Sequence, residues 1–183
     1  MGLGKTIQVL SLLLVLAADV SSSVQEPEFR LQRTGYAKAF LEPRVISAIR
    51  ATPTGRIAVI FVEWSGPLTQ KVVVDWTLVD GEAAARRLSD RIMAAPRAFS
   101  KKSTSISAAI DFSLMQFASA PFRATRRIVD LSGDGDNNSG RPVTVARDVA
   151  MSQGVTINGL VIVAPADNAG RRSHSTPEGG LAN

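Results

Sequence analysis

The sequence contains no cysteine and only one histidine, His174, among its 183 residues. Disulfide scaffolds, thiolate zinc sites, iron–sulfur clusters and cysteine nucleophiles are therefore excluded, as is any metal site with two histidine ligands. Aromatic residues make up only 5% of the chain, and none is interleaved with the basic pairs as a base-stacking platform requires. The scarcity of soft ligands directs attention to oxygen ligands for any metal that the chain binds.

What is present is the composition of one globular domain. Hydrophobic residues make up 45% of the chain and charged residues 20%, so 183 residues suffice for a single core. The net charge of +5 raises the question of nucleic acid. Because the basic pairs are scattered over separate segments, we interpret them as a solvated surface and expect no nucleic-acid partner. Steep salt dependence of DNA binding would favour the alternative.

One apolar run lies near the N-terminus, at residues 7–18, and ends at Asp19. It is too short to cross a bilayer comfortably, so no stable membrane span is expected. Lys5 ahead of an apolar stretch is also typical of a signal peptide. Seven consecutive apolar residues from Leu12 to Ala18 are, however, typical of a buried parallel strand. We favour the strand, because the pattern of the later segments needs it.

The two ends differ from the middle of the chain. Residues 1–11 are expected to be an N-terminal extension; they contain Gly4, Lys5 and Thr6, and Gly-Lys-Thr ending a glycine loop is how P-loop ATPases hold phosphates. The stretch resembles the first motif of Snf-type helicase-like ATPases, so a P-loop ATP-binding protein or ATPase fragment is the alternative function. The required preceding strand and acidic second motif are missing. Residues 164–183 lack an apolar period and predict a flexible tail.

Between the ends, helical and strand patterns alternate. Helices are expected at 26–49 (with a break near Pro43), 82–95, 106–117 and 144–153, and strands at 12–18, 56–64, 70–76, 126–131 and 155–163 (the last interrupted at 158–159). The second and third strands flank turn residues and predict an antiparallel hairpin. This alternation predicts an α/β fold, with a mostly parallel sheet and helices on both faces. Such folds bind ligands beyond the carboxyl ends of the strands, where strand order reverses.

Hydroxyl and carboxylate side chains occur at that predicted edge. Asp19, Ser21 and Ser23 form Asp-x-Ser-x-Ser after the first strand, residues 103–105 offer a hydroxyl before a helix, and Asp134 follows a later strand. Two carboxylates and three hydroxyls suit a hard cation, Mg²⁺ or Mn²⁺. The alternative is that the serines cap the next helix and Asp134 caps a turn.

These motifs, in this order, resemble the metal-ion-dependent adhesion site of von Willebrand factor type A (vWA) domains. The resemblance covers residues 12–163 and assigns the metal ligands Asp19, Ser21, Ser23, Thr104 and Asp134. It is closest to an uncharacterised bacterial vWA subfamily, a domain of unknown function, through segments 62–65, 104–107, 132–138 and 154–159.

The resemblance implies a Rossmann-like three-layer vWA fold with one antiparallel hairpin strand. It implies a non-enzymatic protein-binding module, in which Mg²⁺ or Mn²⁺ keeps an open position for an Asp or Glu carboxylate of a protein partner. Members of the subfamily look exported, which suggests a periplasmic or secreted location, although this N-terminus lacks a convincing cleavable signal peptide.

Type A domains also continue into a final helix, and this sequence turns polar where that helix is expected. We therefore expect the C-terminal helix to be missing. A truncated or mis-started product with degraded function is a further alternative, which a non-cooperative melting curve would support.

Three other polar features have simpler interpretations. Residues 134–140 begin like an EF-hand loop, but Ser139 and Val145 occupy the positions that need Gly and Glu, so 136–138 is interpreted as a loop rimming the adhesion-type site. Glu63 and Asp75 each precede a tryptophan on a strand, and the alternation predicts solvated carboxylates. Ser132 lacks the glycine pattern of a nucleophile elbow.

Overall fold

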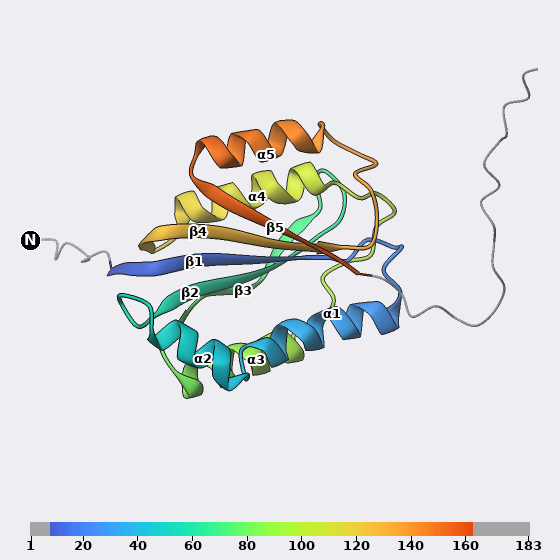
Figure 1. Ribbon diagram of the computed structural model, residues 1–183. Helices are drawn as coiled ribbons and strands as arrows, with labels where there is room; N and C mark the ends of the chain where they lie inside the picture. The colour runs from blue at the N-terminus through green and yellow to red at the C-terminus, as the bar shows by residue number, and fades with distance from the viewer. Residues whose placement is uncertain (1–7, 163–183) are drawn as a thin grey trace, which may run out of the picture.

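The computed structural model describes residues 8–162, which form five strands and five helices (Figure 1). In chain order these are β1 (Gln8–Asp19), α1 (Glu26–Ala39), α2 (Pro43–Arg50), β2 (Ile57–Trp64), β3 (Gln70–Val79), α3 (Glu82–Ala94), α4 (Ile106–Ser119), β4 (Phe122–Gly133), α5 (Val143–Ser152) and β5 (Val155–Val161). Every predicted element is present, and the expected helix break occurs with Pro43 in the first turn of α2. Some details were wrong: β1 begins at Gln8 instead of Leu12, β4 begins at Phe122 instead of Arg126, and β5 runs uninterrupted through Asn158 and Gly159.

The five strands form one sheet in the order β3-β2-β1-β4-β5. β1 pairs in parallel with β2 and with β4, and β5 pairs in parallel with β4, whereas β3 is antiparallel to β2. The predicted mostly parallel sheet with one antiparallel hairpin strand is therefore confirmed. Because β1 is central, the chain leaves it toward β2 on one side and returns to β4 on the other. The strand order therefore reverses beside the carboxyl end of β1.

Helices cover both faces of the sheet, as expected. Figure 1 shows α4 and α5 on one face and α1, α2 and α3 on the other. The apolar run predicted to be a strand is β1, which begins at Gln8. Alternate β1 residues supply the two cores, since Leu13, Val15 and Ala17 face one and Leu14, Leu16 and Ala18 the other. This two-sided burial explains why β1 is almost continuously apolar.

One sequence-based prediction was wrong for β2. Glu63 was expected to be solvated, but its side chain is fully buried and forms an ion pair with Arg33 of α1. Its second oxygen, Oε2, accepts a hydrogen bond from the Ala98 amide at 2.7 Å. β2 lies between two strands and has helices over both faces, so neither side of it meets water. Asp75, on the edge strand β3, is exposed as predicted.

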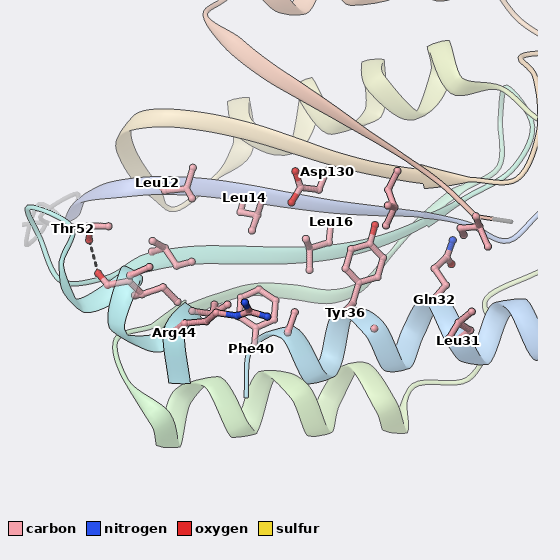
Figure 2. A pocket seen from close by; sticks show the side chains of 18 of the residues that line it. Leu12, Leu14, Leu16, Leu31, Gln32, Tyr36, Phe40, Arg44, Thr52 and Asp130 are labelled. Atoms are coloured by element: carbon pink, nitrogen blue, oxygen red, sulfur yellow. Dashed lines mark hydrogen bonds between the residues drawn. The ribbon is translucent and has the colours of Figure 1, made fainter. Parts of the chain in front are cut away.

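An open apolar groove of about 1040 Å³ lies between α1, α2 and the β1–β4–β5 part of the sheet (Figure 2). Leu14 and Leu16 of β1 form its floor, and Tyr36 points toward them from α1. The Tyr36 hydroxyl donates a hydrogen bond to Ser132 Oγ at 2.8 Å. This bond attaches α1 to β4 close to the carboxyl end of the sheet.

Some sequence-based predictions fall on other parts of the chain. Gly4, Lys5, Thr6, His174 and the predicted tail lie outside residues 8–162, so the ATP-binding alternative stays a prediction. Within the described range, no helix combines the length and apolar character needed to cross a membrane.

The buried ion pair gives a test of the fold. We expect Glu63→Ala to lower the free energy of unfolding by about 3–5 kcal/mol, because it leaves the Arg33 guanidinium buried without its counter-charge. Asp75→Ala, on the exposed edge strand, should cost less than about 0.5 kcal/mol. Urea denaturation of both variants measures the difference. Equal losses would show that the ion pair does not support the fold.

Candidate metal centre

The predicted site residues lie on two adjacent strands that end together. Asp19 is the last residue of β1, and Gly133, just before Asp134, is the last residue of β4. The parallel register pairs Ala18 with Ser132, so the two loops leave the sheet side by side. Segments more than a hundred residues apart in the chain therefore meet at the strand-order reversal.

Four of the five predicted residues are joined by a chain of hydrogen bonds. The Ser21 amide donates to Asp19 Oδ1 at 2.7 Å, and the hydroxyls of Ser21 and Ser23 are 3.0 Å apart. The Ser23 hydroxyl then donates to Asp134 Oδ1 at 2.9 Å. The alternative role as helix caps does not hold for the serines, because α1 begins after Gln25.

Asp19 is the most constrained of these side chains. It is fully buried, and its Oδ2 has no hydrogen-bond partner within the described residues. A Cβ at Gly133 would lie 3.1 Å from this oxygen, so the main chain of β4 passes unusually close to it. A buried carboxylate oxygen without a partner is costly. A cation beside it would remove that cost, so the residues present fit a metal ion.

The charge on Asp19 is correspondingly disfavoured. Burial raises its pKa from 3.8 to about 6, against the opposing effect of the hydrogen bonds from Ser21. The carboxylate of Asp134 also raises this pKa, and the guanidinium of Arg97 lowers it. A divalent cation beside Asp19 would offset both the burial of its charge and the effect of the neighbouring Asp134 carboxylate on it.

Thr104, the fifth predicted residue, is held through its main chain by the 136–139 segment. Its amide donates to Asn138 Oδ1 at 2.9 Å, and its carbonyl accepts hydrogen bonds from the amides of Asn138 and Ser139. The loop predicted to rim the site therefore contacts the start of α4. Within residues 8–162, no hydrogen bond links the Thr104 hydroxyl to Asp19, Ser21, Ser23 or Asp134.

Exposure varies across the five residues in a regular way. Asp19, Ser21 and Thr104 are buried, Asp134 is half-buried and Ser23 is exposed. The group therefore has a closed side toward the sheet and an open side toward solvent. An ion bound there would be reachable by a group from another molecule.

The site is poor in strong ligands. Residues 8–162 contain no cluster of three or more His, Cys, Asp or Glu side chains able to hold a metal. Any ion at this edge would therefore depend on serine and threonine hydroxyls as well as the two carboxylates. A ligand set of oxygen atoms alone, most of them from uncharged hydroxyls, suits Mg²⁺ or Mn²⁺.

The sequence did not indicate the contacts of two residues, Arg97 and Asn138, although Asn138 belongs to the loop that was predicted to rim the site. Asn138 anchors Thr104, and Arg97 donates hydrogen bonds to carbonyls of the Asp19–Ser23 loop. Both contact main-chain groups supplied by distant segments, so neither contact follows from a local motif. The Asp-Gly-Asp-Asn-Asn run marked the Asn138 loop as unusual, whereas nothing in the sequence marked Arg97.

Comparison with known proteins supports the fold. The family model described as "Protein of unknown function (DUF1194)" matches residues 9–175. No curated protein matches the chain significantly.

Several solved structures are similar to this one. Proximal thread matrix protein 1 from the mussel byssus has a TM-score of 0.56 at 19% identity, over 84% of this chain and 38% of that chain. An aerotolerance-related membrane protein from Bacteroides fragilis has a TM-score of 0.54 at 18% identity, over 90% of this chain and 78% of that chain. The pilus adhesin SpaC from Lactobacillus rhamnosus GG has a TM-score of 0.56 at 13% identity, over 86% of this chain and 25% of that chain.

The mussel protein has also been solved with a zinc-occupied metal-ion-dependent adhesion motif, at 20% identity and a TM-score of 0.55. The present chain spans less than two fifths of the mussel protein. At these identities the similarity shows the fold, which is the predicted vWA fold.

The pKa of Asp19 gives a prediction for the metal-free protein. Because this pKa is about 6 when folded and 3.8 when unfolded, the contribution of Asp19 to stability is present below pH 3.8 and is lost as the pH rises through 6. We expect Asp19→Asn, which removes the charge, to raise the free energy of unfolding at pH 7.5 by about 2–3 kcal/mol. Near pH 4.5 the gain should be much smaller.

Urea denaturation in EDTA at the two pH values measures this difference. Asp75→Asn, which removes an exposed carboxylate, is the control. It should change the free energy of unfolding only slightly, and by the same amount at both pH values. A destabilising effect of Asp19→Asn at pH 7.5 would contradict the assignment of a costly buried charge.

Proposed function

Since the chain belongs to the family described as "Protein of unknown function (DUF1194)" and has the vWA fold, we propose that it is a divalent-metal-dependent protein-binding module. In this proposal Asp19, Ser21, Ser23, Thr104 and Asp134 hold the ion. The ion supplies a positive charge with an open position, and an Asp or Glu carboxylate of a protein partner completes its shell. Binding is non-covalent and involves no turnover.

The observation that carries the proposal is the Oδ2 atom of Asp19. It is buried and lacks a partner within the described residues, yet its carboxylate lies at the end of a chain of hydroxyls that leads to Asp134. A purely structural aspartate in this position would be expected to have both oxygens hydrogen-bonded. The hydroxyl-rich surroundings provide the remaining ligands for a hard cation.

Mg²⁺ or Mn²⁺ is the proposed ion. The zinc-occupied mussel protein supports a divalent cation in this fold. Zinc prefers nitrogen and sulfur ligands, whereas the five residues proposed here offer only oxygen. The two harder ions therefore fit this chain better.

A protein partner outside the cytoplasm is proposed with the metal. The similar structures include a pilus adhesin, a byssus matrix protein and a membrane protein, which favours a periplasmic or secreted setting. The net charge of +5 would favour an acidic partner over a basic one. The exposed side of the site, at Ser23 and Asp134, is where such a partner would approach.

Metal binding predicts a thermal shift. Mg²⁺ or Mn²⁺ at 100 times its Kd should stabilise the protein by about 2.7 kcal/mol and raise the Tm by several degrees. The shift should disappear in Asp19→Ala and in Asp134→Asn, which lack a proposed ligand charge. Asp148→Asn, which removes an exposed carboxylate on α5, should retain it. Melting curves of the wild type that are identical with metal and with EDTA would refute the proposal.

The open coordination position predicts a second measurable property. An immobilised glutamate-bearing peptide should bind the protein in Mg²⁺, and binding should be lost in EDTA. The same peptide with glutamine in place of glutamate should not bind, since a neutral amide is a weaker ligand for Mg²⁺. Binding that ignores both changes would show that the basic surface, and not the metal, attracts the peptide.

A further inference from the structure

We propose that Arg97 is a positioning residue that holds the Asp-x-Ser-x-Ser loop in its metal-binding shape. The inference rests on the proposed function, because it concerns the same loop. Arg97 follows α3 and is far from residues 19–24 in the sequence, and it is not one of the proposed ligands. Its action is through the main chain of the loop.

The geometry is a convergence of three carbonyls on one guanidinium nitrogen. Arg97 Nη2 donates hydrogen bonds to the main-chain oxygens of Val20, Ser21 and Val24, at 3.0, 2.9 and 3.0 Å. Charge-assisted bonds of this kind are stronger than neutral ones. They set the orientation of the peptide units on both sides of Ser21, and so the direction in which the Ser21 side chain leaves the loop.

A cation–π contact holds the Arg97 guanidinium in place. It lies over the ring of Phe29 in α1, with 4.9 Å from Cζ to the ring centroid. Phe29 packs with Val20 and Val24 in a small buried cluster beneath the loop. The guanidinium is thus placed between loop carbonyls and an aromatic face, a position that suits arginine and not lysine.

The segment that carries Arg97 is itself anchored to the core. Arg33 donates hydrogen bonds to the carbonyls of Ile92 and Ala95 and forms the buried ion pair with Glu63. Glu63 accepts the hydrogen bond from the Ala98 amide. The residues on either side of Arg97 are therefore attached to α1 and β2, so the main chain that carries the Arg97 side chain is held in place.

A main-chain hydrogen bond also joins the same segment to the loop. The Ser22 amide donates to the Lys101 carbonyl at 2.8 Å. The segment after α3 therefore binds the loop through both amide and carbonyl groups of the loop's main chain. These bonds do not use the side chains of Asp19, Ser21 and Ser23, which in this proposal bind the metal. Such support of ligands by residues outside the coordination shell commonly determines metal affinity.

The experiment compares Arg97→Met, Arg97→Lys and the control Arg87→Met, which removes an exposed arginine of α3. Calorimetric titration with Mg²⁺ and Mn²⁺ measures affinity, and melting in EDTA measures stability without metal. We expect Arg97→Met to weaken metal binding by about 10–100-fold. Arg97→Lys should recover part of this loss, because lysine keeps the charge but not the planar fork. Arg87→Met should bind like the wild type.

Hydrogen exchange in EDTA supplies a readout that does not depend on metal. The amides of residues 20–24 should exchange at least about tenfold faster in Arg97→Met than in the wild type, while the amides of α5 are unchanged. If Arg97→Met does not fold, the same comparison with Arg97→Lys decides the question.

The outcomes separate the two proposals. Unchanged metal affinity in Arg97→Met, with only a lower Tm in EDTA, would overturn the positioning role. Unchanged loop exchange would overturn it as well. A wild type that binds no metal would refute the proposed function instead, and the exchange measurement would still show whether Arg97 holds the loop.

Discussion

The burial of one carboxylate, that of Asp19 at the end of the central strand, is the constraint on which the candidate centre depends. The cost of burying it is reduced on one oxygen by the Ser21 amide and remains on the other. A carboxylate can persist in such a place only when a cation meets it or when the surrounding fold is stable enough to carry the cost. The doubly covered, apolar β1 provides that stability.

The polar contacts that support the Asp19–Ser23 loop also involve buried charged groups. The ion pair of Arg33 with Glu63, the bond from the Ala98 amide and the contacts of Arg97 form one connected set between α1, β2 and the segment after α3. Buried polar groups stabilise a structure when they have their partners, and in this set the Nε atom of Arg33 has none within the described residues. These contacts attach the irregular loops at the carboxyl edge of the sheet to the helices and strands.

Much of the fold could be predicted from the sequence because its signals are local. The apolar run at 12–18, the hairpin turn at 65–69 and the helical spacing from Ile106 to Phe117 each depend on near neighbours in the chain. Glu63 was mistaken for a solvated residue because strand alternation does not report what covers each face. Arg97 escaped notice because its partners are main-chain atoms of a distant loop, and any sequence can supply those. The loop containing Asn138 was predicted to rim the site, but its hydrogen bonds to the Thr104 main chain could not be predicted for the same reason.

The sequence by itself determined the kinds of atom available: no thiols, one histidine, and an ordered set of carboxylates and hydroxyls placed after apolar strands. It also determined the layers, because periodicity follows directly from which residues must leave water. Only the tertiary structure decided that Ser23 reaches Asp134, that Asp19 Oδ2 is enclosed against β4 and that Arg97 lies behind the loop. These depend on the register between β1 and β4 and on the packing of α1 against the segment after α3. Such distances arise only when remote parts of the chain share one core.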